Sequence, residues 1–420
     1  MRNGGARVKK KEYWKIALTV FLNDFNTFVS LHKRMLILYV ALCVILIPIS
    51  WQQDVYDWYF VVGKLFSEGK NVYEPLNVQA IVKRGDTGQW GYPPLFLPFF
   101  SLSYVISTVA GMPFHVVYKP LVAFINVLVA MELEKFVKSS RVVALYLFNP
   151  LTLVSTIIQG FLDVLVIYFI ILALKSLYET SSAVYTGFSS LCKQTAWPLI
   201  PFFIMLNLNK KWCLFFLGLV IGGFIPFLIL DFQAVIVATV LQHQARIGVS
   251  PWSTIIKFIG SGGPLIQFIN IGIATAQLTS IFGLAVVIRT RLKKTNPLDK
   301  MKILEYFVLY EIVSLTFVYF LVPPVPHFLV YLLVPTILLM DVHPEFKYPY
   351  VFMSIAGYAV FTIDQGLRHN IFHYSVWAGP IYLGYYHLEL LVWIVGACLS
   401  LTMYASFFYV FYKIWRRDAN

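Results

Sequence analysis

The chain has 420 residues, of which 59% are hydrophobic and only 13% carry a charge. Its mean hydropathy is +0.73, and apolar runs of about 17 to 25 residues recur along it, long enough to cross roughly 30 Å of hydrocarbon. These features predict an all-α polytopic membrane protein, because isolated strands and loops cannot satisfy their backbone groups in lipid. The net charge of +13 favours an anionic membrane surface as partner over nucleic acid.

A long basic segment comes before the first apolar run. About 34 residues precede that run and no small-residue cleavage site follows it, so we expect a signal anchor and not a cleaved signal peptide. The four cysteines lie in apolar stretches without metal-site spacing, which favours small core side chains. We predict apolar runs at about 35–53, 93–110, 114–134, 142–158, 161–178, 183–208, 212–230, 264–288, 303–322, 327–341, 348–364 and 384–412.

Five clusters of lysine and arginine set the expected topology, because the positive-inside rule places all of them in the cytoplasm. If every apolar run crossed once, the cluster at 135–141 would lie outside. We therefore interpret 93–110 as re-entrant or interfacial. We also split 183–208 into two short helices at 193–198, where a lysine, a glutamine and a proline interrupt it. The result is about twelve crossings with both termini cytoplasmic. The clusters are Arg7 to Lys11 with Lys33 and Arg34; Lys135, Lys138 and Arg141; Lys210 and Lys211; Arg289 to Lys302; and Lys413 to Arg417.

With this topology, the unusual polar residues collect on the extracytoplasmic face, which suggests one site there. We expect a single integral membrane domain over 1–420 without internal repeats. A catalytic module at 35–230 would contain the first outer loop, 54–91, and a variable module at 231–420 the second, 231–255. The other outer segments are 159–163, the break at Lys193, 323–327 and 365–383.

Two carboxylates follow the first apolar run directly. Asp54 and Asp57 open the long polar loop among aromatic neighbours. A membrane enzyme that removes a proton from a hydroxyl group needs such a base at the water interface, partly desolvated. The two are alternatively solvated loop acids, or caps of an amphipathic helix at 55–68. Their D-x-x-D spacing differs from D-x-D, so we expect no paired metal ligands.

Several basic residues are candidates for binding an anion. Lys193 lies deep in an apolar run, which is costly unless it faces a cavity or an anion, or snorkels to an interface. His327 follows a proline cluster and is alternatively an interfacial histidine with local hydrogen bonds. His243 and Arg246 lie in the second outer loop, where an arginine suits a phosphate or pyrophosphate or is only a rim charge. Weaker candidates are Arg368, His369 and His373.

Polar residues also bracket a helix end between Asn149 and Asp163. Asp163 caps the following helix or binds sugar hydroxyls, and Gln159 and Tyr92 are further candidates for substrate binding. No Walker loop, Rossmann fingerprint, nucleophile elbow or zinc spacing occurs. One outer acid with buried cations suggests a phosphate leaving group and a carboxylate base, and argues against a soluble cofactor.

Two stretches resemble the C-type glycosyltransferases. The first is similar to their first outer loop, and the second resembles the polyprenyl-phosphate-mannose-dependent mannosyltransferases of the phosphatidylinositol-mannoside and GPI first mannosyltransferase types. The resemblance covers about 35–210 and, loosely, His327 onward. The residues that carry it are Asp54, Gly69, Tyr73 and Tyr92-Pro93-Pro94 in the first stretch, and Leu147 to Leu151, Gln159-Gly160, Asp163, Gly187, Lys193 and Pro198 in the second.

The resemblance implies a role for three residues. Asp54 matches the catalytic base, Lys193 a lysine near the donor phosphate, and His327 a histidine that approaches it. Gln53 and Val55 stand where the GPI-type pattern has a D-x-D, which leaves the choice between Asp54 and Asp57 open.

The sequence thus predicts an inverting glycosyltransferase with no metal or other cofactor. Its expected donor is a polyprenyl-phosphate hexose, most simply mannose, and its acceptor is lipid-linked or membrane-proximal. The alternatives are a transporter or lipid flippase, which would share broken helices and intramembrane charges, and a non-catalytic subunit of a membrane complex.

Overall fold

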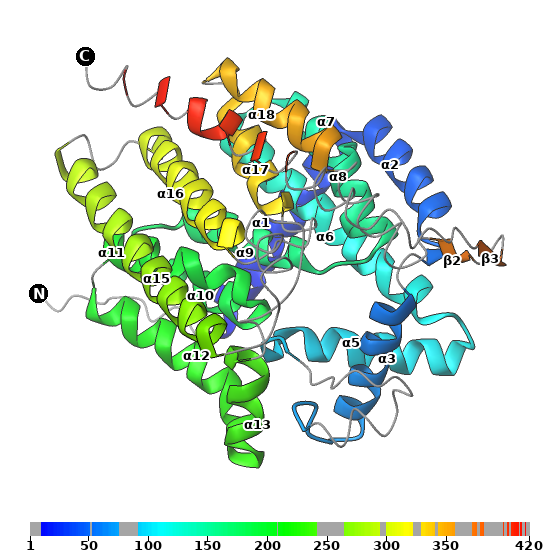
Figure 1. Ribbon diagram of the computed structural model, residues 1–420. Helices are drawn as coiled ribbons and strands as arrows, with labels where there is room; N and C mark the ends of the chain where they lie inside the picture. The colour runs from blue at the N-terminus through cyan, green and yellow to red at the C-terminus, as the bar shows by residue number, and fades with distance from the viewer. Residues whose placement is uncertain are drawn as a thin grey trace, which may run out of the picture.

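The computed structural model describes residues 10–50, 53–74, 91–207, 209–241, 264–294, 300–321, 329–340, 343–357, 372–375 and 379–381, and short helical pieces after residue 397. Most of this chain is helical, and Figure 1 shows the helices packed side by side in one body. The prediction of an all-α fold needs one correction, because three short strands form a small antiparallel sheet.

An additional helix precedes the first predicted transmembrane segment. Helix α1 (Lys10–Leu31) meets α2 (Lys33–Leu46) at a bend of 89°. No helix was predicted for the basic segment before residue 35. On α2, one side is packed inward at Leu36, Tyr39 and Cys43, whereas Ile37, Val44 and other apolar side chains are exposed. Exposed apolar groups on a helix of this kind suit contact with lipid.

Helices α2 and α6 (Phe114–Val137) run antiparallel. At one end, His32 Nε2 lies 2.7 Å from Glu134 Oε1. At the other end, Lys119 Nζ donates a hydrogen bond to the carbonyl oxygen of Ile47, at 3.1 Å. The basic clusters at 33–34 and 135–141 therefore lie at the same end of this helix pair, which supports the interpretation of 93–110 as a segment that does not cross.

Between α2 and α6, the chain forms a separate helical layer. The first outer loop begins with helix α3 (Gln53–Ser67), which agrees with the alternative of a helix at 55–68. Helix α3 packs against α5 (Leu97–Ala110), which follows η1 (Pro94–Phe96). The two approach so closely that a Cβ on Gly63 would lie 2.4 Å from the carbonyl oxygen of Phe100. Figure 1 shows α3 and α5 together at one side of the molecule.

The sheet ties this layer to a distant part of the chain. Helix α2 ends at Leu46, earlier than predicted, and strand β1 (Ile49–Ser50) follows it. Strand β1 pairs with β2 (Phe372–Ser375), with Ile49 opposite Ser375, and β2 pairs with β3 (Gly379–Ile381). Strand pairing supplies partners for backbone groups that a helix end leaves unsatisfied.

The middle of the chain confirms the predicted helix break. After α7 (Ser140–Leu147), α8 (Pro150–Thr152) and η2 (Leu153–Ile158), helices α9 (Asp163–Lys175) and α10 (Thr180–Cys192) form a hairpin. The predicted run at 183–208 then stops being α-helical at Lys193. It continues as η3 (Gln194–Leu199) and α11 (Ile200–Asn207), where Pro198 cannot supply an amide hydrogen.

The second half contains α12 (Lys210–Leu230), α15 (Pro264–Lys294), α16 (Lys300–Leu321), α17 (Leu329–Met340), η7 (Pro344–Phe346), α18 (Lys347–Phe352) and η8 (Met353–Gly357). Part of the predicted second outer loop is helical, as α13 (Phe232–Ile236) and η4 (Val237–Leu241). His343 Nε2 lies 2.8 Å from Glu305 Oε1, so the start of α16 and the end of α17 meet.

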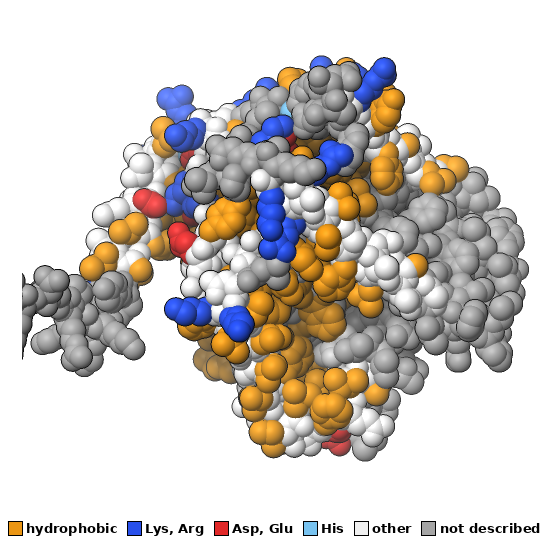
Figure 2. Space-filling model, turned by 90° about the vertical axis from the view of Figure 1, so that its left-hand side faces the viewer, with side chains coloured by type: hydrophobic (Ala, Val, Ile, Leu, Met, Phe, Trp, Pro, Cys, Tyr) orange, Lys and Arg blue, Asp and Glu red, His pale blue; other side chains and the backbone are white. Residues whose placement is uncertain are grey.

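Among the described residues, two single helices, α6 and α12, are long and apolar enough to cross a membrane, and up to four spans result if each bent pair counts as one. The count of twelve crossings therefore stays a prediction. Helix α12 exposes Leu214, Ile229 and other large apolar side chains. Figure 2 shows a broad area of hydrophobic side chains on one face, with lysine and arginine side chains above it. Composition and these exposed faces together indicate a helical membrane protein.

Candidate functional site

A buried ion pair stands where the α9–α10 hairpin opens. Asp163 is the first residue of α9 and Lys193 follows the last residue of α10, so the antiparallel packing brings them together. Lys193 Nζ donates hydrogen bonds to both carboxylate oxygens of Asp163, at 2.9 Å each. Asp163 is 2% exposed and Lys193 4%. Each charge stabilises the other here, because a buried charge without a partner has a large unfavourable free energy.

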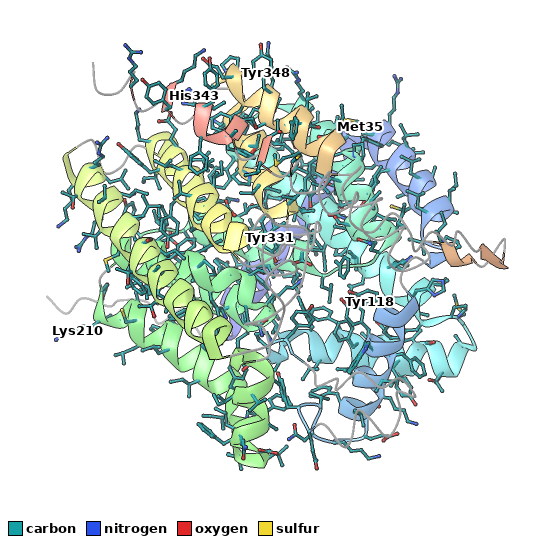
Figure 3. All side chains as sticks on the ribbon, viewed as in Figure 1. Met35, Tyr118, Lys210, Tyr331, His343 and Tyr348 are labelled. Carbon is teal, nitrogen blue, oxygen red and sulfur yellow. The ribbon has the colours of Figure 1, made fainter. Side chains whose placement is uncertain are left out.

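Helix α17 adds a hydroxyl group to this pair. Tyr331 donates a hydrogen bond to Asp163 Oδ1 at 2.8 Å, and Thr195 donates one to the Tyr331 hydroxyl oxygen, also at 2.8 Å. Figure 3 shows Tyr331 in the middle of the molecule, far from Lys210 and His343 at its edge. We call Asp163, Lys193 and Tyr331 the polar cluster. It draws together three segments that the sequence separates widely.

The first outer loop also reaches the polar cluster. Lys193 Nζ lies 5.0 Å from the centre of the Tyr92 ring, within the range of a cation–π contact. Gln194, next to Lys193, donates hydrogen bonds to the backbone oxygens of Gly91 and Thr239. Tyr73 donates a hydrogen bond to the carbonyl oxygen of Tyr92 at 2.9 Å. Burial raises the pKa of Tyr73 well above its usual value, so its hydroxyl keeps the proton that this bond requires.

Gln159 lies in the turn that leads to Asp163. It is fully buried, and within the described part of the chain neither its amide nitrogen nor its amide oxygen has a hydrogen-bond partner. The next residue, Gly160, has a φ of +71°, a left-handed conformation that favours glycine. An unsatisfied buried amide costs about 1 to 3 kcal/mol. Such a group is uncommon in a folded chain and is a candidate for binding a polar ligand.

A narrow apolar groove, with a free volume of about 10 Å³, lies next to the polar cluster, since Tyr331 lines it. It runs between α9, α16 and α17. One acid, Glu311, stands among its apolar lining and is only 2% exposed. The remaining lining residues are Ile167, Ile170, Ile171, Leu174, Phe307, Val334, Pro335 and Leu338.

Of the predicted site residues, Tyr92, Asp163 and Lys193 are thus brought together, with Gln159 on the adjoining turn. The structure assigns Asp163 a definite partner, Lys193. Asp54 and Asp57 lie in the first two turns of α3. His373 lies within β2, which pairs with the strand just before α3. His243, Arg246, His327, Arg368 and His369 lie outside the described residues.

The sequence analysis missed Tyr331 and Glu311. The signal for Glu311 was present, because an acid within the apolar run at 303–322 is unusual. Tyr331 gave no such signal, since a tyrosine in an apolar run is ordinary. Within the described part of the chain, no group of three or more His, Cys, Asp or Glu side chains could hold a metal ion. The expectation that no metal is used stays a prediction.

The comparisons with known proteins leave the family open. No family model matches the chain, and no curated protein matches it. A crystal structure of ArnT from Cupriavidus metallidurans, bound to undecaprenyl phosphate, aligns over 89% of this chain and 76% of that one, with a TM-score of 0.44 and 11% identity. Similarity at that level establishes neither fold nor function, which have to be inferred from the residues of this chain.

Proposed function

We propose that the chain is an integral membrane glycosyltransferase. It transfers a hexose, most simply mannose, from a polyprenyl-phosphate donor to a lipid-linked or membrane-proximal acceptor on the extracytoplasmic face. The observation that carries this proposal is the polar cluster at the end of an apolar groove. A donor with a charged phosphate and a long hydrocarbon chain needs these two environments side by side.

In the proposed reaction, the donor phosphate lies near Lys193, and the hydrocarbon chain lies along the apolar side chains of α9 and α17 that line the groove. Lys193 is already desolvated, so it meets the donor phosphate without having to leave water, and the phosphate shares its ammonium group with the Asp163 carboxylate. His327 and Arg246 are further candidates for this phosphate. Gln159 offers both a donor and an acceptor for sugar hydroxyls.

Asp54 is the proposed general base, and Asp57 the second candidate. The acceptor hydroxyl gives its proton to the carboxylate as its oxygen attacks the anomeric carbon. The new bond forms as the bond from that carbon to the phosphate oxygen breaks, so the anomeric centre inverts. Polyprenyl phosphate leaves with the bonding electron pair. The crossing count of twelve and cytoplasmic termini remain part of the proposal.

The direct test is turnover by the purified protein. In liposomes with a radiolabelled polyprenyl-phosphate mannose and extracted membrane lipids, we expect label to move from the donor to a second lipid or glycan. Lys193→Met and His327→Ala should each slow this transfer by about one to two decades, because a charge-assisted hydrogen bond contributes roughly 1.5–3 kcal/mol. Unchanged donor after prolonged incubation with several polyprenyl-phosphate hexoses would reject the proposal.

Glu311 favours a second candidate function, a transporter or lipid flippase. A buried acid in an apolar groove is a typical site for a coupling proton or cation. The variant Glu311→Gln separates the two functions. If the chain is a glycosyltransferase, we expect transfer to persist in this variant. If it is a transporter, proteoliposomes should move lipid or solute without transferring sugar, and Glu311→Gln should abolish that movement.

A further inference from the structure

Two consecutive residues of α6, Tyr118 and Lys119, contact both halves of the proposed site. Both side chains are fully buried. Lys119 donates hydrogen bonds to the carbonyl oxygens of Ile47 and Ile49, where α2 ends and β1 begins. Carbonyl groups at a helix end lack helical partners. A buried lysine amino group that donates to them fixes the path of the chain there more firmly than water would.

This anchored backbone leads directly into the helix of the proposed base. Ile49 precedes Asp54 by five residues, and Tyr59 follows Asp54 by five. The Tyr59 ring stacks on Phe100 with centroids 4.4 Å apart, and packs edge-on against Tyr118 at 5.7 Å. The start of α3 is therefore held on both sides, by Lys119 before it and by Tyr118 after it.

Tyr118 connects this helix to the polar cluster. Its hydroxyl donates a hydrogen bond to the carbonyl oxygen of Gly160 at 2.7 Å. Gly160 belongs to the turn between η2 and α9, three residues before Asp163, which pairs with Lys193. Figure 3 shows Tyr118 next to α3, on the other side of the molecule from Lys210.

We propose that Tyr118 and Lys119 are positioning residues that set the separation between the base on α3 and the phosphate site at Lys193. The inference rests on the proposed function, since only a two-part reaction needs this separation to be fixed. A displacement of about 1 Å between reacting groups can cost about 10²-fold in rate. Neither residue is expected to touch the substrate, so both should act on the rate and not on donor affinity.

The test compares Tyr118→Phe with a matched control. Tyr118→Phe keeps the ring and its stacking, and removes the hydroxyl with its hydrogen bond to Gly160. The control is Tyr350→Phe, which also removes one tyrosine hydrogen bond to a backbone oxygen, that of Leu145 at 2.9 Å. We expect Tyr118→Phe to lower kcat by about 10- to 100-fold with the donor KM changed by less than about twofold. Tyr350→Phe should leave both unchanged. Lys119→Met should lower kcat in the same way, with donor binding retained as evidence of folding.

Each other outcome has a defined meaning. If Asp54→Asn is inactive while Tyr118→Phe and Lys119→Met keep the wild-type kcat, the positioning role is wrong and the proposed function stands. If Tyr118→Phe loses donor binding and thermal stability together with kcat, the role is structural only and the inference fails. If Asp54→Asn and Lys193→Met are both fully active, the proposed function fails and the positioning role fails with it.

Discussion

Lys193 and Asp163 form a bidentate ion pair, with both nitrogen–oxygen distances at 2.9 Å, inside an apolar part of the chain. A lysine that snorkels would place its ammonium group in water or among lipid headgroups. This one is 4% exposed and is held by a carboxylate. The snorkelling interpretation of Lys193 is therefore wrong for this structure. The remaining question is whether the pair serves folding alone or also a ligand.

The first prediction separates stability from activity at this pair. Lys193→Met leaves the Asp163 carboxylate buried without its cation, which should destabilise the protein by about 3–5 kcal/mol. The double variant Lys193→Met with Asp163→Leu removes both charges and should recover most of the thermal stability. Its transfer rate should stay about one to two decades below wild type, because no ammonium group remains for the phosphate. Melting temperature and initial rate are measured on the same preparations. Recovery of both in the double variant would show that the pair is only structural.

The second prediction concerns the hydroxyl of Tyr331. Tyr331→Phe removes the hydrogen bond to Asp163 and the one received from Thr195. Since the carboxylate keeps its bonds to Lys193, the loss should be modest, about 0.5 to 1.5 kcal/mol of stability. Donor affinity should fall, because Tyr331 also lines the groove. Thr195→Val is the control, since it removes the hydrogen bond from Thr195 to Tyr331 and leaves the one from Tyr331 to Asp163. Equal donor affinities in Tyr331→Phe and wild type would show that the groove beside Tyr331 is not part of the donor site.

The third prediction concerns topology. His32 with Glu134 and Lys119 with Ile47 make α2 and α6 antiparallel, so the loop after α6 should face the cytoplasm with the N-terminus. In intact cells, a cysteine in place of Ser139 should resist a membrane-impermeant thiol reagent, and one in place of Glu74 should react. Both cysteine variants should also carry Cys398→Ser, because Cys398 is exposed and could react with the reagent itself. Labelling at 139 would overturn this orientation.

The sequence predicted the helix break at Lys193 because a lysine and a proline within an apolar run are costly for reasons that act locally. It did not predict that Asp163 is the partner of Lys193. That contact depends on the register of the α9–α10 hairpin, which side-chain packing decides and which no local pattern records. Asp163 had been proposed as a helix cap or a sugar ligand. It is the first residue of α9 and the counter-ion of Lys193, and its role as a sugar ligand stays a prediction.

Other omissions have different causes. Lys119 carried a visible signal, a lysine within the predicted run at 114–134, yet its role depends on where the end of α2 lies. Helix α1 was missed because its charged residues masked its helical pattern; Lys135 and Asp24, 2.7 Å apart, tie it to α6. The strand pairing between β1 and β2 joins segments more than three hundred residues apart, and a two-residue strand leaves no periodic signal.

The last prediction concerns the base. Asp54→Asn keeps the size and hydrogen-bonding capacity of the side chain but removes the proton acceptor. If Asp54 is the general base, transfer should fall by about 10²- to 10⁴-fold, with normal expression and little change in donor affinity. Asp57→Asn should be milder, because an acid that orients or caps contributes less than the base itself.

The pH dependence of transfer supplies an independent check on this role. Only the ionised carboxylate can accept a proton, so the rate should rise with pH on the acidic limb in wild type. In Asp54→Asn that limb should flatten, since the group that titrates is gone. Full activity in Asp54→Asn with an inactive Asp57→Asn would exchange the two roles. Full activity in both variants would remove catalysis from α3, and the buried acid Glu311 would then make transport the leading hypothesis.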